Sequence, residues 1–384
     1  MPNSARQWLL VAAVGLLGAC GGDSAKKENI EPPTPLTEFA PSAVVQKLWS
    51  SSVGGGAAEL GAGLVPAVGG GRVFFAGPDG DIVAHDASSG RRLWSKKYES
   101  FSGGPGTNGS LVVAGTIEGA LIAVDAETGL ENWRARMSSE VISAPVVSTD
   151  TVVAMANDGR THALKASDGS QIWAVDRGVP LLSLRGNAAP ILTSNSVIVA
   201  GANGTVTALA LSDGRPIWEQ RIGVGEGRTD LERMIDIDGR MVLLNGDLFV
   251  VGYESGAQAL TADAGRTLWQ RDMSSVSGLA AGSDGVFIAA SDGAVWALDR
   301  RSGGALWKNE VLLHRMLSAP VLMGDYVVVG DLEGYLHWFK RADGELAVRT
   351  RLGDGGFGDG LVVVDDTLYA QNRDGSVGAF RLRN

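Results

Sequence analysis

One short segment recurs eight times along the chain, and this repeat restricts the possible folds more than any other feature. In the copy from Val112 to Trp133, a β-branched run predicts a first strand, Gly119 tolerates the positive φ of a tight turn, and a second turn precedes a Trp-bearing strand. The turn glycines of the eight copies are Gly80, Gly119, Gly159, Gly204, Gly256, Gly293, Gly334 and Gly375. Their spacings are 39, 40, 45, 52, 37, 41 and 41 residues. A period near forty with four short strands predicts an all-β fold, an eight-bladed β-propeller of four-stranded antiparallel blades.

The two ends of the chain carry complementary fragments of the repeat. The eighth copy starts at Leu368 and ends before any Trp strand, while Val44–Trp49 is a Trp strand without a hairpin before it. We therefore expect the N-terminal strand to complete the last blade, which removes two open sheet edges. A seven-bladed ring would leave one fragment unpaired. The propeller is predicted to be one domain, residues 43–384.

Six tryptophans share one position in the repeat, a glycine followed by three residues and then Trp. A repeated position in such an array solves a repeated packing problem, so these side chains are predicted to pack between blades. A ligand-stacking role is the weaker alternative. The seventh blade has Val348 in this frame, after Gly344. The six residues are Trp94, Trp133, Trp173, Trp218, Trp269 and Trp307.

The first twenty residues differ from the rest of the chain. Arg6 precedes the apolar run Trp8–Leu17, which suits a signal peptide and is short for a membrane span. The run ends in Leu17-Gly18-Ala19-Cys20, which resembles the lipobox of bacterial lipoproteins and implies cleavage after residue 19 and lipidation of Cys20. Gly21 suggests sorting to the outer membrane. A plain secretory signal with an incidental cysteine is the alternative.

A proline-bearing stretch follows the cysteine. Residues 20–42 show little periodic hydrophobicity and are predicted to be a flexible tether that holds the propeller in the periplasm, at the inner face of the outer membrane. The chain as a whole has a net charge of −10, a pI near 5.0 and no Lys/Arg block, so nucleic acid is excluded as a partner.

Two consecutive connections between repeats are longer than the others. Counted from the Trp position to the next β-run, they measure 24 residues (173 to 197) and 31 residues (218 to 249), against 17 to 20 elsewhere. Insertions of this kind occupy loops on one face of a propeller, and adjacent blades bring the two together. We expect them to form a protein-recognition surface.

Aliphatic and charged residues in the two long connections suit this role. The first contains Leu182 and Leu184 on one side of an extended segment, followed by Arg185, and the second contains Asp236 and Asp238 on a shared face. Two plainer interpretations stay open: the leucines are core residues, or the aspartates only pair with Arg185 or Arg233.

A family resemblance becomes specific at these two segments. The repeat by itself looks like the pyrroloquinoline-quinone (PQQ) propeller superfamily. Leu182-Ser183-Leu184-Arg185-Gly186 together with Asp230–Asp238, behind a lipobox, resembles the BamB family, lipoprotein subunits of the outer-membrane β-barrel assembly (BAM) machinery. The resemblance covers essentially the whole mature chain.

The resemblance implies a non-catalytic scaffold without a cofactor. In that family the matching residues dock on the POTRA domains of BamA, the central barrel subunit, which carries over to Leu182, Leu184, Arg185, Asp236 and Asp238. Nascent outer-membrane proteins are possible further partners. One departure puts the path of a strand in doubt, because Gly239-Arg240-Met241 stands where the family often has a proline.

Two other functions compete with the scaffold. A PQQ-dependent dehydrogenase would have a vicinal cysteine pair, a bound calcium and a longer chain, whereas this chain has one cysteine and four scattered histidines. A calcium-binding propeller could use the alternating acids around Asp236 and Asp238, but the glycine-punctuated spacing of calcium loops is missing. We therefore predict no catalytic residue and no metal site.

Overall fold

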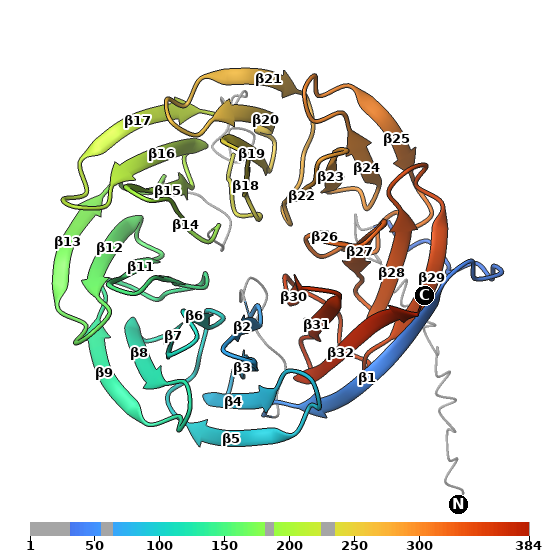
Figure 1. Ribbon diagram of the computed structural model, residues 1–384. Coiled ribbons are helices and arrows are strands. Elements are labelled where there is room, and N and C mark those ends of the chain that lie inside the picture. Colours follow the sequence, from blue (N-terminus) through green and yellow to red (C-terminus); the bar gives the residue numbers. More distant parts are fainter. Residues whose placement is uncertain (1–30, 55–63, 181–187, 224–234, 384) are drawn as a thin grey trace, which may run out of the picture. The chain divides into compact units, whose positions relative to one another are not determined.

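The computed structural model describes residues 31–54, 64–180, 188–223 and 235–383. The strands of this part of the chain form eight four-stranded sheets, arranged as the blades of a ring (Figure 1). The predicted eight-bladed β-propeller is confirmed. No helix among the described residues is long and apolar enough to cross a membrane.

Each blade presents one short strand to the centre of the ring and runs outward from it (Figure 1). For blades 1 to 8 in turn, the innermost strands are β2 (Ala67–Gly69), β6 (Gly106–Thr107), β10 (Val146–Val147), β14 (Ile191–Leu192), β18 (Val242–Leu244), β22 (Leu279–Ala281), β26 (Val321–Met323) and β30 (Leu361–Val364). The second strands are β3 (Arg72–Ala76), β7 (Leu111–Gly115), β11 (Thr151–Met155), β15 (Ser196–Gly201), β19 (Asp247–Gly252), β23 (Val286–Ala289), β27 (Tyr326–Gly330) and β31 (Thr367–Gln371).

The outer half of each blade continues the same order. The third strands are β4 (Asp81–Asp86), β8 (Ala120–Asp125), β12 (Arg160–Lys165), β16 (Thr205–Ala210), β20 (Gly256–Thr261), β24 (Val295–Leu298), β28 (Tyr335–Lys340) and β32 (Ser376–Arg383). The outermost strands are β5 (Arg92–Lys97), β9 (Glu131–Arg136), β13 (Gln171–Asp176), β17 (Pro216–Arg221), β21 (Thr267–Arg271), β25 (Ala305–Asn309), β29 (Leu346–Arg351) and β1 (Val44–Ser52).

The ring closes through blade 8, which is built from both ends of the chain. β1 pairs antiparallel with β32, from Val44 opposite Arg383 to Ser52 opposite Ser376. The sheet order is β1-β32-β31-β30, so the N-terminal strand is the outermost strand of the last blade, as predicted.

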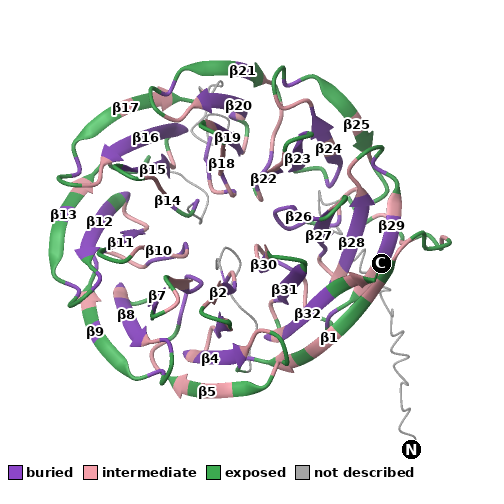
Figure 2. Ribbon diagram, in the orientation of Figure 1, coloured by how far each residue is buried: buried purple, intermediate pink, exposed green. Residues whose placement is uncertain are grey.

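The core lies between blades, because each blade buries both faces against its neighbours. Phe74 and Ile82 of blade 1 pack with Val112 and Ile122 of blade 2, and all four side chains have no exposed surface. Figure 2 shows the second and third strands as mainly buried and most of the outermost strands as mainly exposed.

The tryptophans of the outermost strands join each blade to the next one. The Trp94 indole N–H donates to Ala126 O at 3.1 Å, and its ring covers Gly129, where a Cβ would lie 2.6 Å from Trp94 Cε3. The prediction that these side chains pack between blades is confirmed. The same bond recurs as Trp49 to Ala87, Trp133 to Ala166, Trp173 to Leu211, Trp218 to Ala262, Trp269 to Arg300 and Trp307 to Arg341.

Blade 7 departs from this rule because of how the ring closes. The acceptor carbonyl and the covered glycine lie in the turn between the third and fourth strands of the next blade. In blade 8 these two strands, β32 and β1, come from opposite ends of the chain and have no such turn. Val348 takes the tryptophan position and packs in a cluster with Leu361 and Phe380.

The compact unit that contains the propeller spans Pro33–Asn384. Ser42 N–H donates to Ala347 O at 2.9 Å, which connects the segment before β1 to blade 7. The predicted signal peptide, Cys20 and the first part of the predicted tether lie outside the described residues.

Candidate partner-binding site

The two long connections leave equivalent points of adjacent blades. Residues 177–190 join β13 to β14, and residues 222–241 join β17 to β18. All blades have the same strand order, so every connection from an outermost strand to the next innermost strand lies on the same face of the ring. We call this face the connection face.

The first long connection is described only at its ends. Leu182, Leu184 and Arg185 lie outside the described residues, so their predicted role stays a prediction. Before them, Arg177 donates to Thr207 Oγ1 at 3.0 Å and to Ala200 O at 3.1 Å. These bonds fix the start of the connection on blade 4.

The two aspartates of the second connection have different surroundings. Asp236 is buried, its backbone pairs antiparallel with Tyr253, and its Oδ1 accepts the Ile237 N–H at 2.9 Å. Asp238 is only partly buried, and its Oδ1 has no hydrogen-bond partner among the described residues. This oxygen is itself buried, and Asp238 also interacts with Asp236 through a side-chain hydrogen bond.

The two carboxyl groups do not carry two full charges at neutral pH. Burial raises the pKa of Asp238 to about 9, and the charge of the neighbouring Asp236 adds to this effect. Asp238 is consequently protonated near pH 7. Calcium prefers ionised carboxylates, so this arrangement disfavours the calcium alternative.

Arg240 connects the end of the second connection to the adjacent blade 6 and to the more distant blade 8. Its N–H donates to Ser277 O at 3.1 Å, and its carbonyl accepts the Leu279 N–H at 3.2 Å, both next to blade 6. Its side chain donates from Nη2 to Leu361 O of blade 8 at 2.9 Å. The connection therefore enters blade 5 along a fixed path.

The carboxylate of Asp359 interacts electrostatically with the Arg240 guanidinium. Asp359 precedes β30, and its Oδ1 accepts the Ala319 N–H at 3.4 Å. Burial raises the pKa of Asp359, and the positive charge of Arg240 opposes that rise. The charges of Arg240 and Asp359 thus link the connections that lead into blades 5 and 8, and the Ala319 N–H of blade 7 donates to the same acid.

The sequence predictions missed Arg240, although the repeat contains a signal for it. The residue two positions before the innermost strand is alanine in blades 3, 4 and 7, namely Ala144, Ala189 and Ala319. Arg240 is the large side chain at this position in blade 5. Met241 occupies the proline position, and β18 still pairs with β19 in regular register, which settles the strand path that the sequence left in doubt.

Glycines make the approach of Arg240 to blade 6 possible. A Cβ at Gly239 would lie 2.4 Å from Gly278 N, and a Cβ at Gly278 would lie 2.1 Å from Arg240 N. Gly278 also has a φ of +103°, which L side chains rarely adopt. No group of three or more His, Cys, Asp or Glu side chains in the described part of the chain could hold a metal ion.

Comparisons with known proteins agree on one family. The family model described as outer membrane protein assembly factor BamB matches residues 45–100, 78–309 and 297–384. The protein of that name from Xanthomonas campestris pv. campestris is 42% identical over 393 residues, which cover 97% of each chain. The crystal structure of BamB from Moraxella catarrhalis aligns with a TM-score of 0.81 and 30% identity, covering 88% of this chain and 100% of that one.

Enzymes with the same architecture are more distant. A quinohemoprotein alcohol dehydrogenase from Comamonas testosteroni aligns with a TM-score of 0.66 and 15% identity, covering 88% of this chain and 76% of the enzyme. At this identity the likeness shows the fold alone.

Proposed function

The chain belongs to the family of the outer membrane protein assembly factor BamB, and on this premise we propose that it is a lipid-anchored periplasmic scaffold that docks on the POTRA domains of BamA. It serves outer-membrane protein assembly as part of the BAM machinery and is not an enzyme. The proposal adds the partner subunit, the docking residues and the anchor.

The fixed path of the second connection is the observation that carries the docking proposal. Its described end is held by the Asp236–Tyr253 backbone pair and by the bonds of Arg240 to blades 6 and 8. A segment held in this way loses little conformational entropy when it binds a partner, and the smaller entropy cost favours affinity. The proposed docking residues are Asp236 and Asp238 at this end of the second connection, together with Leu182, Leu184 and Arg185 of the first connection, which lie outside the described residues.

Calorimetric titration tests this docking site. The lipid-free propeller is titrated with the soluble POTRA domains of the same organism's BamA, as wild type and as Arg185→Glu. Arg215→Glu is the matched control, because Arg215 is exposed in the turn after β16, on the face opposite the connection face. We expect Arg185→Glu to abolish binding at an unchanged Tm and Arg215→Glu to bind like wild type. Equal binding by both variants would place the docking site elsewhere.

The anchor is tested separately at Cys20. The Cys20→Ser variant is expected to leave the outer-membrane fraction and to lose incorporation of an alkyne-labelled fatty acid, while the wild type keeps both. A wild-type chain that incorporates no label would refute lipidation.

A further inference from the structure

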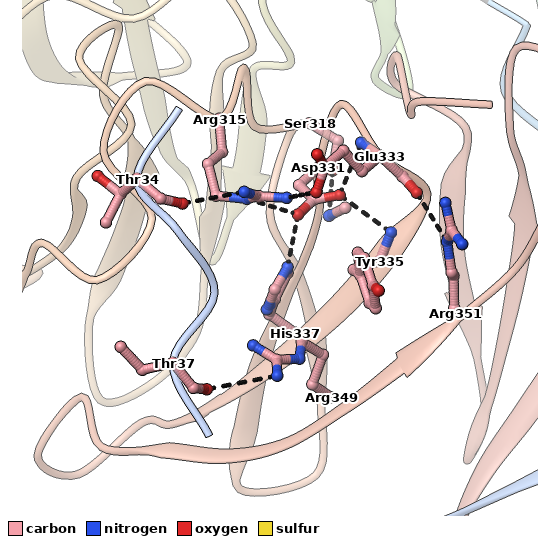
Figure 3. Close-up of polar contacts among 11 residues, drawn as sticks. Thr34, Thr37, Arg315, Ser318, Asp331, Glu333, Tyr335, His337, Arg349 and Arg351 are labelled. Carbon is pink, nitrogen blue, oxygen red and sulfur yellow. Dashed lines mark hydrogen bonds and ion pairs between the residues drawn. The ribbon is translucent and has the colours of Figure 1, made fainter. Parts of the chain in front are cut away.

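A buried ionic cluster lies beneath the N-terminal segment of the propeller, on blade 7 (Figure 3). Arg315, Asp331 and His337 are 2%, 0% and 0% exposed. Arg315 Nε donates to Asp331 Oδ2 at 2.8 Å, and His337 Nε2 lies 3.0 Å from the same oxygen. The N–H groups of Glu333 and Tyr335 donate to Asp331 Oδ1 at 3.0 Å each. Together these five residues form what we call the Arg315 socket.

The Arg315 socket binds the backbone carbonyl of Thr34, in the N-terminal segment, residues 33–42. Arg315 Nη1 donates to Thr34 O at 3.0 Å, and Thr34 N–H donates to Leu313 O at 3.0 Å. Thr34 is therefore bound through both its donor and its acceptor. Because the guanidinium is buried, its bond to this carbonyl is among the stronger kinds of hydrogen bond.

The residues on both sides of Arg315 have strained backbone conformations. His314 and Met316 have φ values of 60° and 48°, although neither is glycine. Such conformations persist only where the surroundings determine them, and here they place the intervening guanidinium inside the blade.

The rest of the N-terminal segment continues along the outside of blade 7. Leu36 packs on the cluster that contains Phe287 and Phe339. The Arg349 guanidinium donates to Thr37 O at 3.3 Å and lies 5.5 Å from the centre of the Phe39 ring. These contacts, with the Ser42 bond, hold the segment from the socket to β1.

The socket belongs to the connection face. Leu313 and Arg315 lie between β25 and β26, which is the position in blade 7 that residues 177–190 and 222–241 occupy in their own blades. The turn between β28 and β29 of the same blade lies on the opposite face. The chain before Thr34 therefore leaves the ring at the rim of the face that carries both long connections.

We infer that the Arg315 socket fixes where the lipid anchor leaves the propeller, and that the connection face is consequently the face turned toward the membrane. The inference rests on the proposed lipidation of Cys20. The 13 residues from Cys20 to Pro33 (33 − 20) reach about 45 Å when fully extended and about 20 Å on average as a flexible chain. A compact domain of this size has a radius of gyration of about 20 Å, so the exit point decides which face stays closer to the lipid.

Energy transfer on the full lipidated chain tests this orientation. Cys20 is the only native cysteine, and its lipid blocks the thiol, so one engineered cysteine can be labelled at a time. Val311→Cys places a donor dye on the connection face of blade 7, and Ala342→Cys places it in the opposite turn of the same blade; both residues are exposed. The acceptor is a labelled lipid in vesicles of phosphatidylethanolamine and phosphatidylglycerol. We expect higher transfer from position 311, and equal or reversed transfer would overturn the inference.

A second variant distinguishes the effect of the socket on orientation from the effect of the tether. Thr34→Pro removes the N–H that donates to Leu313 O and leaves Arg315, Asp331 and His337 intact. In this variant the difference between positions 311 and 342 should shrink, and protease should cleave between residues 33 and 42 faster. Glu38→Ala, at an exposed position of the same segment, is the control and should behave like wild type. A Thr34→Pro chain with the full difference would show that the socket does not set the orientation, whereas a wild-type chain that does not bind vesicles would refute the anchor itself.

Discussion

Arg240 Nη2 donates to the carbonyl oxygen of Leu361 at 2.9 Å, although Arg240 lies in the connection that leads into blade 5 and Leu361 begins the innermost strand of blade 8, 121 positions further along the chain. Most polar contacts between blades join blades that follow one another in the ring. This contact instead joins blades 5 and 8, which have blades 6 and 7 between them. It links the end of the second long connection to the blade that closes the ring.

Removal of this contact should destabilise the propeller. Arg240→Met is expected to lower the free energy of unfolding by about 1.5–3 kcal/mol, because a charged donor is lost and Asp359 loses one of its two neighbouring cations, Arg240 and Arg373. Denaturant unfolding measures the loss. The double variant Arg240→Met/Asp359→Asn should lose less than the sum of the two single variants, since the buried acid is then gone. Strict additivity would contradict coupling between the two residues.

The shared proton of the aspartate pair should make stability depend on pH. The folded-state pKa of Asp238 is raised from 3.8 to about 9, so the folded chain binds more protons than the unfolded chain between these values. The contribution of Asp238 to the free energy of unfolding is therefore fully present below about pH 4 and is lost as the pH rises toward 9. Asp238→Asn should raise Tm, by a larger margin at pH 8 than at pH 5.

The control for this titration is Asp263→Asn, at an exposed turn acid of blade 5. A margin for Asp238→Asn that is the same at pH 5 and pH 8, or that matches the control, would mean that Asp238 is ionised in the folded chain.

The turn glycines beneath the tryptophans should tolerate alanine less well than other turn glycines. Gly129 has a φ of +69° and a Cβ there would lie 2.6 Å from Trp94 Cε3, whereas Gly71 has a φ of +72° with nothing within 4 Å. Gly71→Ala should cost about 1–2 kcal/mol from backbone strain alone. Gly129→Ala should cost about 1–3 kcal/mol more because the indole must move. Thermal unfolding of the two variants checks this, and equal losses would show that the ring contact contributes nothing.

Tryptophan in the seventh blade should harm the protein even though it restores the repeat. Val348→Trp is expected to lower stability by about 1–3 kcal/mol, because blade 8 offers neither the turn carbonyl nor the glycine that receives an indole. The reciprocal variant Trp307→Val should also lower stability, through loss of the bond to Arg341 O and of buried area. A rise in Tm for Val348→Trp would contradict this account of ring closure.

Local regularity made the architecture predictable. A strand, a glycine turn and a tryptophan frame are each encoded within a few residues, so eight copies were sufficient to predict eight blades and the pairing of β1 with β32. The same local frame identified the tryptophans as contacts between blades. It did not explain Val348, since the missing turn exists only where the two ends of the chain meet.

The candidate site was predictable in outline only. The unequal lengths of the connections located both long segments, and the structure places them on the same face of adjacent blades. The alternation of Asp236 and Asp238 suggested two surface carboxylates, but Asp236 is buried and the pKa of Asp238 is raised. Burial and proton sharing depend on side chains from other blades, which spacing along the chain does not record.

By itself the sequence determined the fold, the blade count and the closure, because these follow from short-range patterns that repeat, and it determined the family through short motifs in the two long connections. The tertiary structure alone decided that Arg240 reaches Leu361, that Asp238 holds a proton, and that Arg315 binds Thr34 across 281 positions of sequence. These contacts exist only once the ring is closed, since closure brings the first residues of the propeller onto blade 7 and brings the start of blade 8 within reach of Arg240. Their energies come from burial inside that ring, and no local pattern encodes them.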